Sequence, residues 1–181
     1  MKPYNSTNEA ADLSALMPRL KHADTRYAML CKIFPILYSV LIVVYIVIII
    51  HDYFTEGLSK EDISTIFFIL SMLSFVVLFR KLYKEYNYVD YSLPTVIMLK
   101  HAVKRYTPFS RFTAWALASV LLMDIGLSFE STDWHDLINI QIFFLGSICI
   151  SILIGLMIWR VRYKPLRDEA LRLIREIEEA E

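Results

Sequence analysis

The fold of this chain is decided by an uncharged stretch, Ile33-Phe-Pro-Ile-Leu-Tyr-Ser-Val-Leu-Ile-Val-Val-Tyr-Ile-Val-Ile-Ile-Ile50. As an α-helix it would be about 27 Å long at ~1.5 Å per residue, close to the ~30 Å thickness of a bilayer's hydrocarbon core. Its β-branched residues would also suit a strand, but ordinary strands have only about 3–10 residues. A lone strand in lipid would also leave its backbone polar groups unpaired. We therefore predict a transmembrane helix here.

Three further apolar runs follow this first one. Of the 181 residues, 56% are hydrophobic, which exceeds the ~45–50% usual for a soluble domain. The sequence therefore predicts an all-α membrane protein with four transmembrane helices. The predicted spans cover residues 33–50, 63–79, 112–129 and 138–159. Because the first run lies behind a long polar lead, we expect a retained anchor and not a cleaved signal peptide.

Positive charges alternate with the predicted spans. Of the 19 Lys and Arg residues, only Lys60 lies outside residues 1–32, 80–111 and 160–181. The positive-inside rule places these three segments in the cytoplasm. We therefore predict a multi-pass protein, most simply of the cell (inner) membrane, with both termini cytoplasmic. This orientation would leave the glycosylation sequon at Asn5 unused.

The predicted domains are a cytoplasmic N-terminal segment (residues 1–32), a four-helix transmembrane domain (33–159, with the connector 80–111) and a C-terminal helix (160–181). The N-terminal segment has apolar side chains near helical spacing, at Leu13, Leu16, Leu20 and Tyr27. Pro18 is expected to kink or split this amphipathic helix.

The connector and the tail each predict a further amphipathic helix. Ser92 is a candidate N-cap for a connector helix at residues 94–106. The tail is expected to start a new helix at Pro165, and its apolar stripe must be buried against something. The N-terminal helix, the connector helix, a second copy and a protein partner all remain open. The candidate interface consists of Leu166, Ala170, Leu173, Ile174 and Ile177.

Asp124 is the one charged residue within a predicted span. An Asp at the centre of a transmembrane helix costs about 2.5–3.5 kcal/mol, so the third span needs its neighbours. Intramembrane acids often mark proton or cation paths. The alternative is a buried, hydrogen-bonded residue that joins helices, which we favour because no second acid or base lies within a span. Tyr45 and Ser147 are expected at a comparable depth.

Small residues recur every four positions on two predicted spans. This spacing allows close helix packing, most simply within the chain, although a dimer face would show the same pattern. The residues are Ser147, Ser151 and Gly155 on the fourth span, and Ala114 and Ala118 on the third.

The basic connector could bind anionic lipid headgroups, since each Lys or Arg near a membrane surface contributes ~1 kcal/mol. Its charges could equally serve only to fix the orientation, and no nucleic-acid-binding motif accompanies them. The candidate headgroup ligands are Arg80, Lys81, Lys84, Lys100, Lys104 and Arg105.

Enzyme and metal motifs are absent from the sequence. It has no glycine-rich phosphate loop, Cys-x-x-Cys, His-Glu-x-x-His or Gly-x-Ser-x-Gly motif. The outer connectors hold a few candidate metal ligands, but polar loops of this kind are usually only solvated, and we predict no metal and no cofactor. These residues are His51, Asp52, Asp133, His135 and Asp136.

The sequence thus predicts a non-enzymatic anchoring or regulatory membrane protein. It would engage a cytoplasmic protein, or its own copies, through its amphipathic helices. The alternative is a small oligomeric transporter or channel that uses Asp124. Apart from the lipid bilayer and such a partner no ligand is expected, and nucleic acid is not.

Overall fold

The computed structural model describes residues 6–55, 57, 60–130 and 133–179, which exclude the sequon at Asn5. All regular structure in these residues is helical, which confirms the predicted all-α class. Four helices are long and apolar enough to cross a membrane, so the chain is a multi-pass membrane protein. The elements are α1 (Ser6–Thr55), α2 (Lys60–Asn87), α3 (Thr95–Arg105), α4 (Arg111–Glu130), α5 (Trp134–Ile158), the π-helical turn η1 (Trp159–Tyr163) and α6 (Lys164–Glu178).

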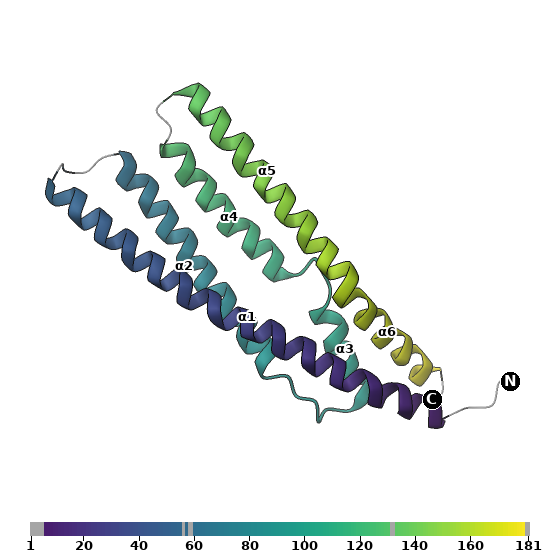
Figure 1. Cartoon of the computed structure of the whole chain (residues 1–181). Helices are drawn as coiled ribbons and strands as arrows, with labels where there is room; N and C mark the ends of the chain where they lie inside the picture. The colour runs from purple at the N-terminus through teal and green to yellow at the C-terminus, as the bar shows by residue number, and fades with distance from the viewer. Residues whose placement is uncertain (1–5, 56, 58–59, 131–132, 180–181) are drawn as a thin grey trace.

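The four membrane-crossing helices form an open row in the order α1, α2, α4, α5 (Figure 1). α1 packs along α2, and α2 packs along α4, whereas α5 touches α4 only sparsely. None of the residues of α5 is buried. A helix with apolar side chains on all its faces can remain uncovered by protein in a bilayer, because lipid chains are as apolar as its own side chains.

A second group of helices lies beyond one end of the four membrane-crossing helices, along their axes. It consists of residues 13–32 of α1 together with α3 and α6, and we call it the juxtamembrane layer (Figure 1). α6 contacts both α3 and α1 there. Because α1 runs unbroken from this layer into the membrane, the layer and the first span share one helix axis.

The structure tests the predicted effects of two prolines on helix boundaries. Pro18 does not split α1, which is a single helix of 50 residues. Its neighbours Leu16 and Leu20 are fully buried, and this packing holds the helix across the missing hydrogen bond. α6 begins at Lys164 with Pro165 in its first turn, close to the predicted start, but it is not a separate helix, because α5, η1 and α6 follow one another without a break. A π-helical turn just before Pro165 absorbs the change in hydrogen bonding.

The predicted N-cap of the connector helix is also wrong. Pro94 occupies the N-cap position of α3, and no side chain caps the helix there. Ser92 instead donates both its N–H and its hydroxyl to Asp90 Oδ1, at 2.8 and 2.6 Å. This local Asx turn uses the side chain that would otherwise have capped the helix.

Candidate functional site

The juxtamembrane layer has a hydrophobic core of its own. Leu16 and Leu20 of α1, Leu99 of α3 and Leu173 of α6 are essentially inaccessible to solvent within it. The amphipathic faces of three separate segments therefore cover one another. The tail stripe is part of this core, since Leu166, Ala170, Leu173 and Ile174 are buried and Ile177 is partly buried against it. The sequence left open what covers the tail stripe. In the structure it is covered by the N-terminal helix and the connector helix.

A buried ionic network crosses this layer near the membrane. Asp24 of α1 is only 2% exposed, and its carboxylate accepts three hydrogen bonds. Arg105 Nη2 donates to Oδ2 at 3.0 Å, the Tyr91 hydroxyl donates to Oδ2 at 2.7 Å, and the Tyr106 hydroxyl donates to Oδ1 at 2.6 Å. The Arg105 side chain is itself only 7% exposed. A carboxylate so buried is tolerated because a cation and two hydroxyls satisfy it.

The two tyrosines respond to this environment. Burial raises the pKa of Tyr106, and the negative charge of Asp24 raises it further. The pKa of Tyr91 is raised in the same way, first by burial and then by its hydrogen bond to Asp24. Both hydroxyls are therefore firmly protonated donors at neutral pH, which is the role that the carboxylate requires of them.

The buried role of Asp24 was not predicted, although the sequence contains a signal for it. Asp24 lies four residues after Leu20 and three before Tyr27, so it occupies the apolar face of the N-terminal helix. An acid on an apolar stripe requires a buried partner, but the partner lies on another helix and the spacing cannot identify it.

Where the layer meets the membrane, the structure has a partly open cavity of about 1090 Å³, which we call the membrane-edge cavity. Its walls come from α1, α2, α3, α4, the end of α5 and η1. The wall toward the spans is apolar and includes Phe75, Phe112 and Ala116, with Gly155 and Ile158 on the α5 side. This volume slightly exceeds the ~300–1,000 Å³ range of ordinary ligand sites.

The opposite wall of the membrane-edge cavity is polar and mainly basic. It includes Lys104, Arg105 and Arg111, against the acids Glu85 and Asp90. Arg105 Nε is buried and has no hydrogen-bond partner in the described part of the chain. A buried donor without an acceptor costs about 1–3 kcal/mol, so this nitrogen requires an explanation.

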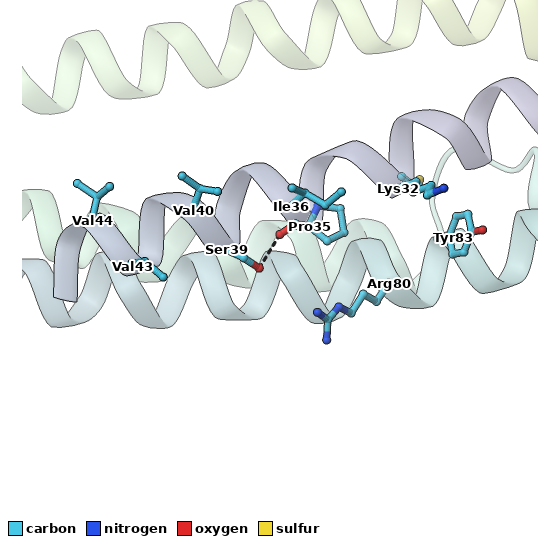
Figure 2. Close-up of a pocket in the computed structure, with 10 residues that line it drawn as sticks. Lys32, Pro35, Ile36, Ser39, Val40, Val43, Val44, Arg80 and Tyr83 are labelled. Atoms are coloured by element: carbon cyan, nitrogen blue, oxygen red, sulfur yellow. Dashed lines mark hydrogen bonds between the residues drawn. The ribbon is translucent and has the colours of Figure 1, made fainter. Parts of the chain in front are cut away.

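A shallower groove of about 610 Å³ follows α1 and α2 on the membrane side (Figure 2). Lys32 and Arg80 lie toward one end of it, and Val43 and Val44 form the other end. Within the groove the Ser39 hydroxyl donates to the Pro35 carbonyl at 2.7 Å. The cations of this α1–α2 groove are therefore separate from those of the membrane-edge cavity.

The six residues predicted to bind lipid headgroups lie in different environments. Arg105 is buried against Asp24, Lys100 pairs with Glu178 at 2.7 Å, and Lys81 lies 4.6 Å from the ring centre of Trp115. Arg80 lines the α1–α2 groove, Lys104 lines the membrane-edge cavity, and Lys84 is exposed. The six residues therefore do not form one basic patch.

The three intramembrane polar candidates are not brought together. Asp124 Oδ1 is buried without a hydrogen-bond partner among the described residues. The Tyr45 ring lies 6.2 Å, between ring centres, from the ring of Phe68 of α2, and the two ring planes are tilted by 50°. Ser147 is exposed and donates back to the Phe143 carbonyl of its own helix at 2.8 Å. No hydrogen bond between these three residues is present in the described chain.

The small residues that were expected to pack helices within the chain do not do so. Ala114 and Ala118 of α4, and Ser147, Ser151 and Gly155 of α5, are all exposed. The close contact instead involves Ser119 and Gly126 of α4, both of which are buried. The Ser71 hydroxyl on α2 donates to the Ser119 carbonyl at 2.7 Å. The sequence pattern pointed to the wrong face of α4 because a stripe of small residues does not reveal which neighbour approaches it.

Two of the candidate metal ligands form a close pair, His51 Nδ1 and Asp52 Oδ1 at 3.1 Å. In the described segments, no three His, Cys, Asp or Glu side chains gather closely enough to hold a metal ion. No family model matches the chain, and no curated protein or solved structure is significantly similar to it.

Proposed function

We propose that this chain is a non-enzymatic membrane protein of the anchoring or regulatory type. Its juxtamembrane layer lies in the cytoplasm, most simply beneath the cell (inner) membrane, and holds a protein partner or a second copy of the chain. The observation that carries this proposal is the separate apolar core of the layer, whose Tyr106 also bonds the buried Asp24–Arg105 pair. If the basic segments of this layer served only to fix the orientation in the membrane, they would not need to fold into a packed core.

Helix continuity supports the regulatory part of the proposal. α1 runs from the layer through the first span, and α6 follows α5 and η1 without a break. A partner that shifts α1 or α6 in the layer would therefore move the first or fourth span with it. The fourth span can respond easily, because none of the residues of α5 is buried.

The partner would contact the exposed faces of the layer, since its apolar faces are already covered. On α6 this outer face carries Asp168, Arg172, Arg175 and Glu179. It bears charges of both signs, which suits a polar and reversible protein contact. Deleting the tail would be a poor test of this idea, because the deletion would also remove four buried side chains of the core.

Photo-crosslinking on α6 tests the proposal in the intact membrane. A photoreactive amino acid at exposed Asp168 or Arg175 should give a discrete adduct with another protein or with a second copy. The same amino acid at buried Leu173 is the matched control and should crosslink only within the chain. Finding no intermolecular adduct from either exposed position would refute the proposed partner contact.

The proposed orientation has its own test. A membrane-impermeant thiol reagent is added to intact cells that produce a Cys149→Ser chain carrying either Asp133→Cys or Arg175→Cys. The positive-inside distribution predicts labelling at residue 133 and protection at residue 175 until the cells are opened. The opposite pattern would place the layer outside the cytoplasm.

One observation favours a second function, that of an oligomeric transporter or channel. Asp124 Oδ1 is buried and has no hydrogen-bond partner among the residues that the structure describes, and intramembrane acids frequently serve proton or cation transfer. In that case Asp124→Asn would abolish ion or proton flux into proteoliposomes, whereas substitutions on the outer face of α6 would leave the flux unchanged. If Asp124→Asn has no effect on flux, or no flux is found, the residue is structural.

A further inference from the structure

α5 is fastened to the rest of the chain mainly at its two ends. At one end, Trp159 Nε1, just past the helix, donates to the Tyr106 carbonyl at 2.7 Å. At the other end, Gln141 Nε2 donates to Ser128 Oγ of α4 at 3.1 Å. Between these points α4 and α5 make few contacts, and the membrane-edge cavity lies between their ends on the layer side.

The α4 and α5 sides of this cavity have room for an extended apolar group. Gly155 lines the cavity, and a Cβ atom added there would meet no atom within 4 Å. Ala116 lies on the α4 side and Ile158 on the α5 side. The surfaces of α4 and α5 that line the cavity here are apolar. An acyl chain from the adjacent leaflet matches this surface, because it buries apolar area without displacing any polar contact.

The other end of the cavity has the chemistry of an anion site. Lys104 and Arg111 line it, and neither forms an ion pair in the described structure. Arg105 also lines it, and its buried Nε lacks an acceptor, although Nη2 is paired with Asp24. Of the two acids among the lining residues, Asp90 accepts hydrogen bonds from Ser92, and Glu85 is the other. The available groups are therefore mainly cations and donors.

We propose that the membrane-edge cavity binds one anionic phospholipid from the leaflet next to the juxtamembrane layer. Its phosphate head lies near Lys104, Arg105 and Arg111, and an acyl chain lies between α4 and α5. Lys104 and Arg111, unpaired among the described residues, supply cationic donors for the phosphate oxygens, and a guanidinium can bind such oxygens through several N–H groups at once. This proposal goes beyond the anchoring function and depends on no protein partner.

Such a lipid would join parts of the chain that otherwise contact each other little. Its head would touch α3, which carries Lys104 and Arg105, and the start of α4 at Arg111. Its chain would fill the space beside Gly155 on α5. The lipid would therefore brace the fourth span against the rest of the row, and its removal should loosen α5 more than the other helices.

Native mass spectrometry of the full chain in a mild detergent tests the proposal. Phosphatidylglycerol and phosphatidylcholine with the same acyl chains are offered separately. We expect one phosphatidylglycerol molecule per chain to be retained, at least about tenfold more tightly than phosphatidylcholine, because each nearby cation contributes about fivefold. Equal retention of the two lipids, or many weakly held molecules and no single one, would overturn the proposal.

The chain offers two glycines as a matched pair of variants. Gly155→Phe fills the cavity from α5, whereas Gly146→Phe changes the same helix outside the cavity. Both glycines have open space around an added Cβ, so neither variant should disturb the fold. Gly155→Phe should lower lipid retention at least tenfold, and Gly146→Phe should not. If both variants retain the lipid equally, the cavity is not its site. Ala116→Leu, which narrows the cavity from α4, should also lower retention.

Charge variants test the head of the site. Combined Lys104→Gln and Arg111→Gln should remove the preference for the anionic lipid, whereas Lys32→Gln and Arg80→Gln, in the α1–α2 groove, should retain it (Figure 2). Inorganic phosphate separates a lipid site from a site for the free anion. If phosphate binds at the cavity while phosphatidylglycerol does not, the site recognises a soluble anion and the lipid proposal fails. A loss caused only by the groove variants would move the site to the groove and would equally overturn the proposal.

Discussion

Asp24 of α1 and Arg105 of α3 form a buried ion pair, 3.0 Å between Oδ2 and Nη2, although 81 residues separate them in the chain. The pair joins the helix of the first span to the helix of the middle connector. The Tyr106 hydroxyl, from the residue after Arg105, bonds the second carboxylate oxygen. The same Tyr106 accepts the Trp159 indole N–H through its backbone carbonyl, so the network extends to the end of the fourth span.

Removing the charge of Asp24 should strongly destabilise the juxtamembrane layer. Asp24→Asn leaves the Arg105 guanidinium buried without a counter-charge, and breaking a buried pair from one side costs about 3–5 kcal/mol. The control is Glu169→Gln, which breaks the Arg19–Glu169 pair at 2.8 Å. Because that pair is partly exposed to solvent, with the two side chains 53% and 25% accessible, its loss should cost only about 0–1 kcal/mol. Thermal unfolding in detergent measures the stability of both variants. Equal decreases in melting temperature would show that the buried pair contributes no more to stability than the Arg19–Glu169 pair.

Alkaline pH should weaken the layer through its tyrosines. The pKa of Tyr106 and the pKa of Tyr91 are raised above their ordinary value of 10.0, mainly by burial and then by Asp24. Below about pH 10 both hydroxyls are protonated in the folded and the unfolded chain. Above it the unfolded chain loses their protons first, so the free energy of unfolding falls as the pH rises.

Thermal melting between pH 8 and pH 11 measures this dependence. Tyr106→Phe should lower stability at pH 8, because it removes a hydrogen bond to a carboxylate worth about 1.5–3 kcal/mol. The same variant should weaken the decline above pH 10. A decline as steep as that of the unaltered chain would show that Tyr106 does not contribute to the pH dependence.

A large side chain at Gly126 should destabilise the packing of α4 on α2, in contrast to one at the other glycines on the spans. A Cβ added there would lie 3.0 Å from Phe68 Cε1 and 3.1 Å from the Ser64 carbonyl oxygen. Gly126→Leu should therefore push α4 away from α2 and cost about 1–3 kcal/mol. Gly146→Leu is the control, since no atom lies within 4 Å of a Cβ added there. A cysteine crosslink between α2 and α4 reports the separation, and equal crosslinking in both variants would contradict the close approach.

The serine hydroxyls between α2 and α4 should contribute little to the free energy of unfolding. Ser71 donates to the Ser119 carbonyl at 2.7 Å, and Ser74 Oγ lies 2.7 Å from Ser119 Oγ. Hydrogen bonds between membrane helices average about 0.6 kcal/mol and reach about 1.7 kcal/mol at most. Ser71→Ala should therefore lower the free energy of unfolding by less than about 2 kcal/mol, as measured by unfolding in mixed detergent. A loss comparable to that of Asp24→Asn would require a tighter polar contact than these distances imply.

The sequence by itself determined the class of this protein. Uncharged runs near the thickness of a bilayer required helices, because a helix pairs its own backbone groups in lipid. The stripe Leu166, Ala170, Leu173 and Ile174 likewise showed that the tail helix must bury one face. Both inferences rest on local spacing along a single helix, and local spacing is visible in a sequence.

Only the tertiary structure decided which surfaces meet. It covered the tail stripe with α1 and α3, and it gave Asp24 partners that lie 67, 81 and 82 residues away. It also packed α4 through Ser119 and Gly126 and left Ala114 and Ala118 exposed. Periodicity identifies a face that needs a partner, but the identity of that partner depends on how helices far apart in the chain pack together in space.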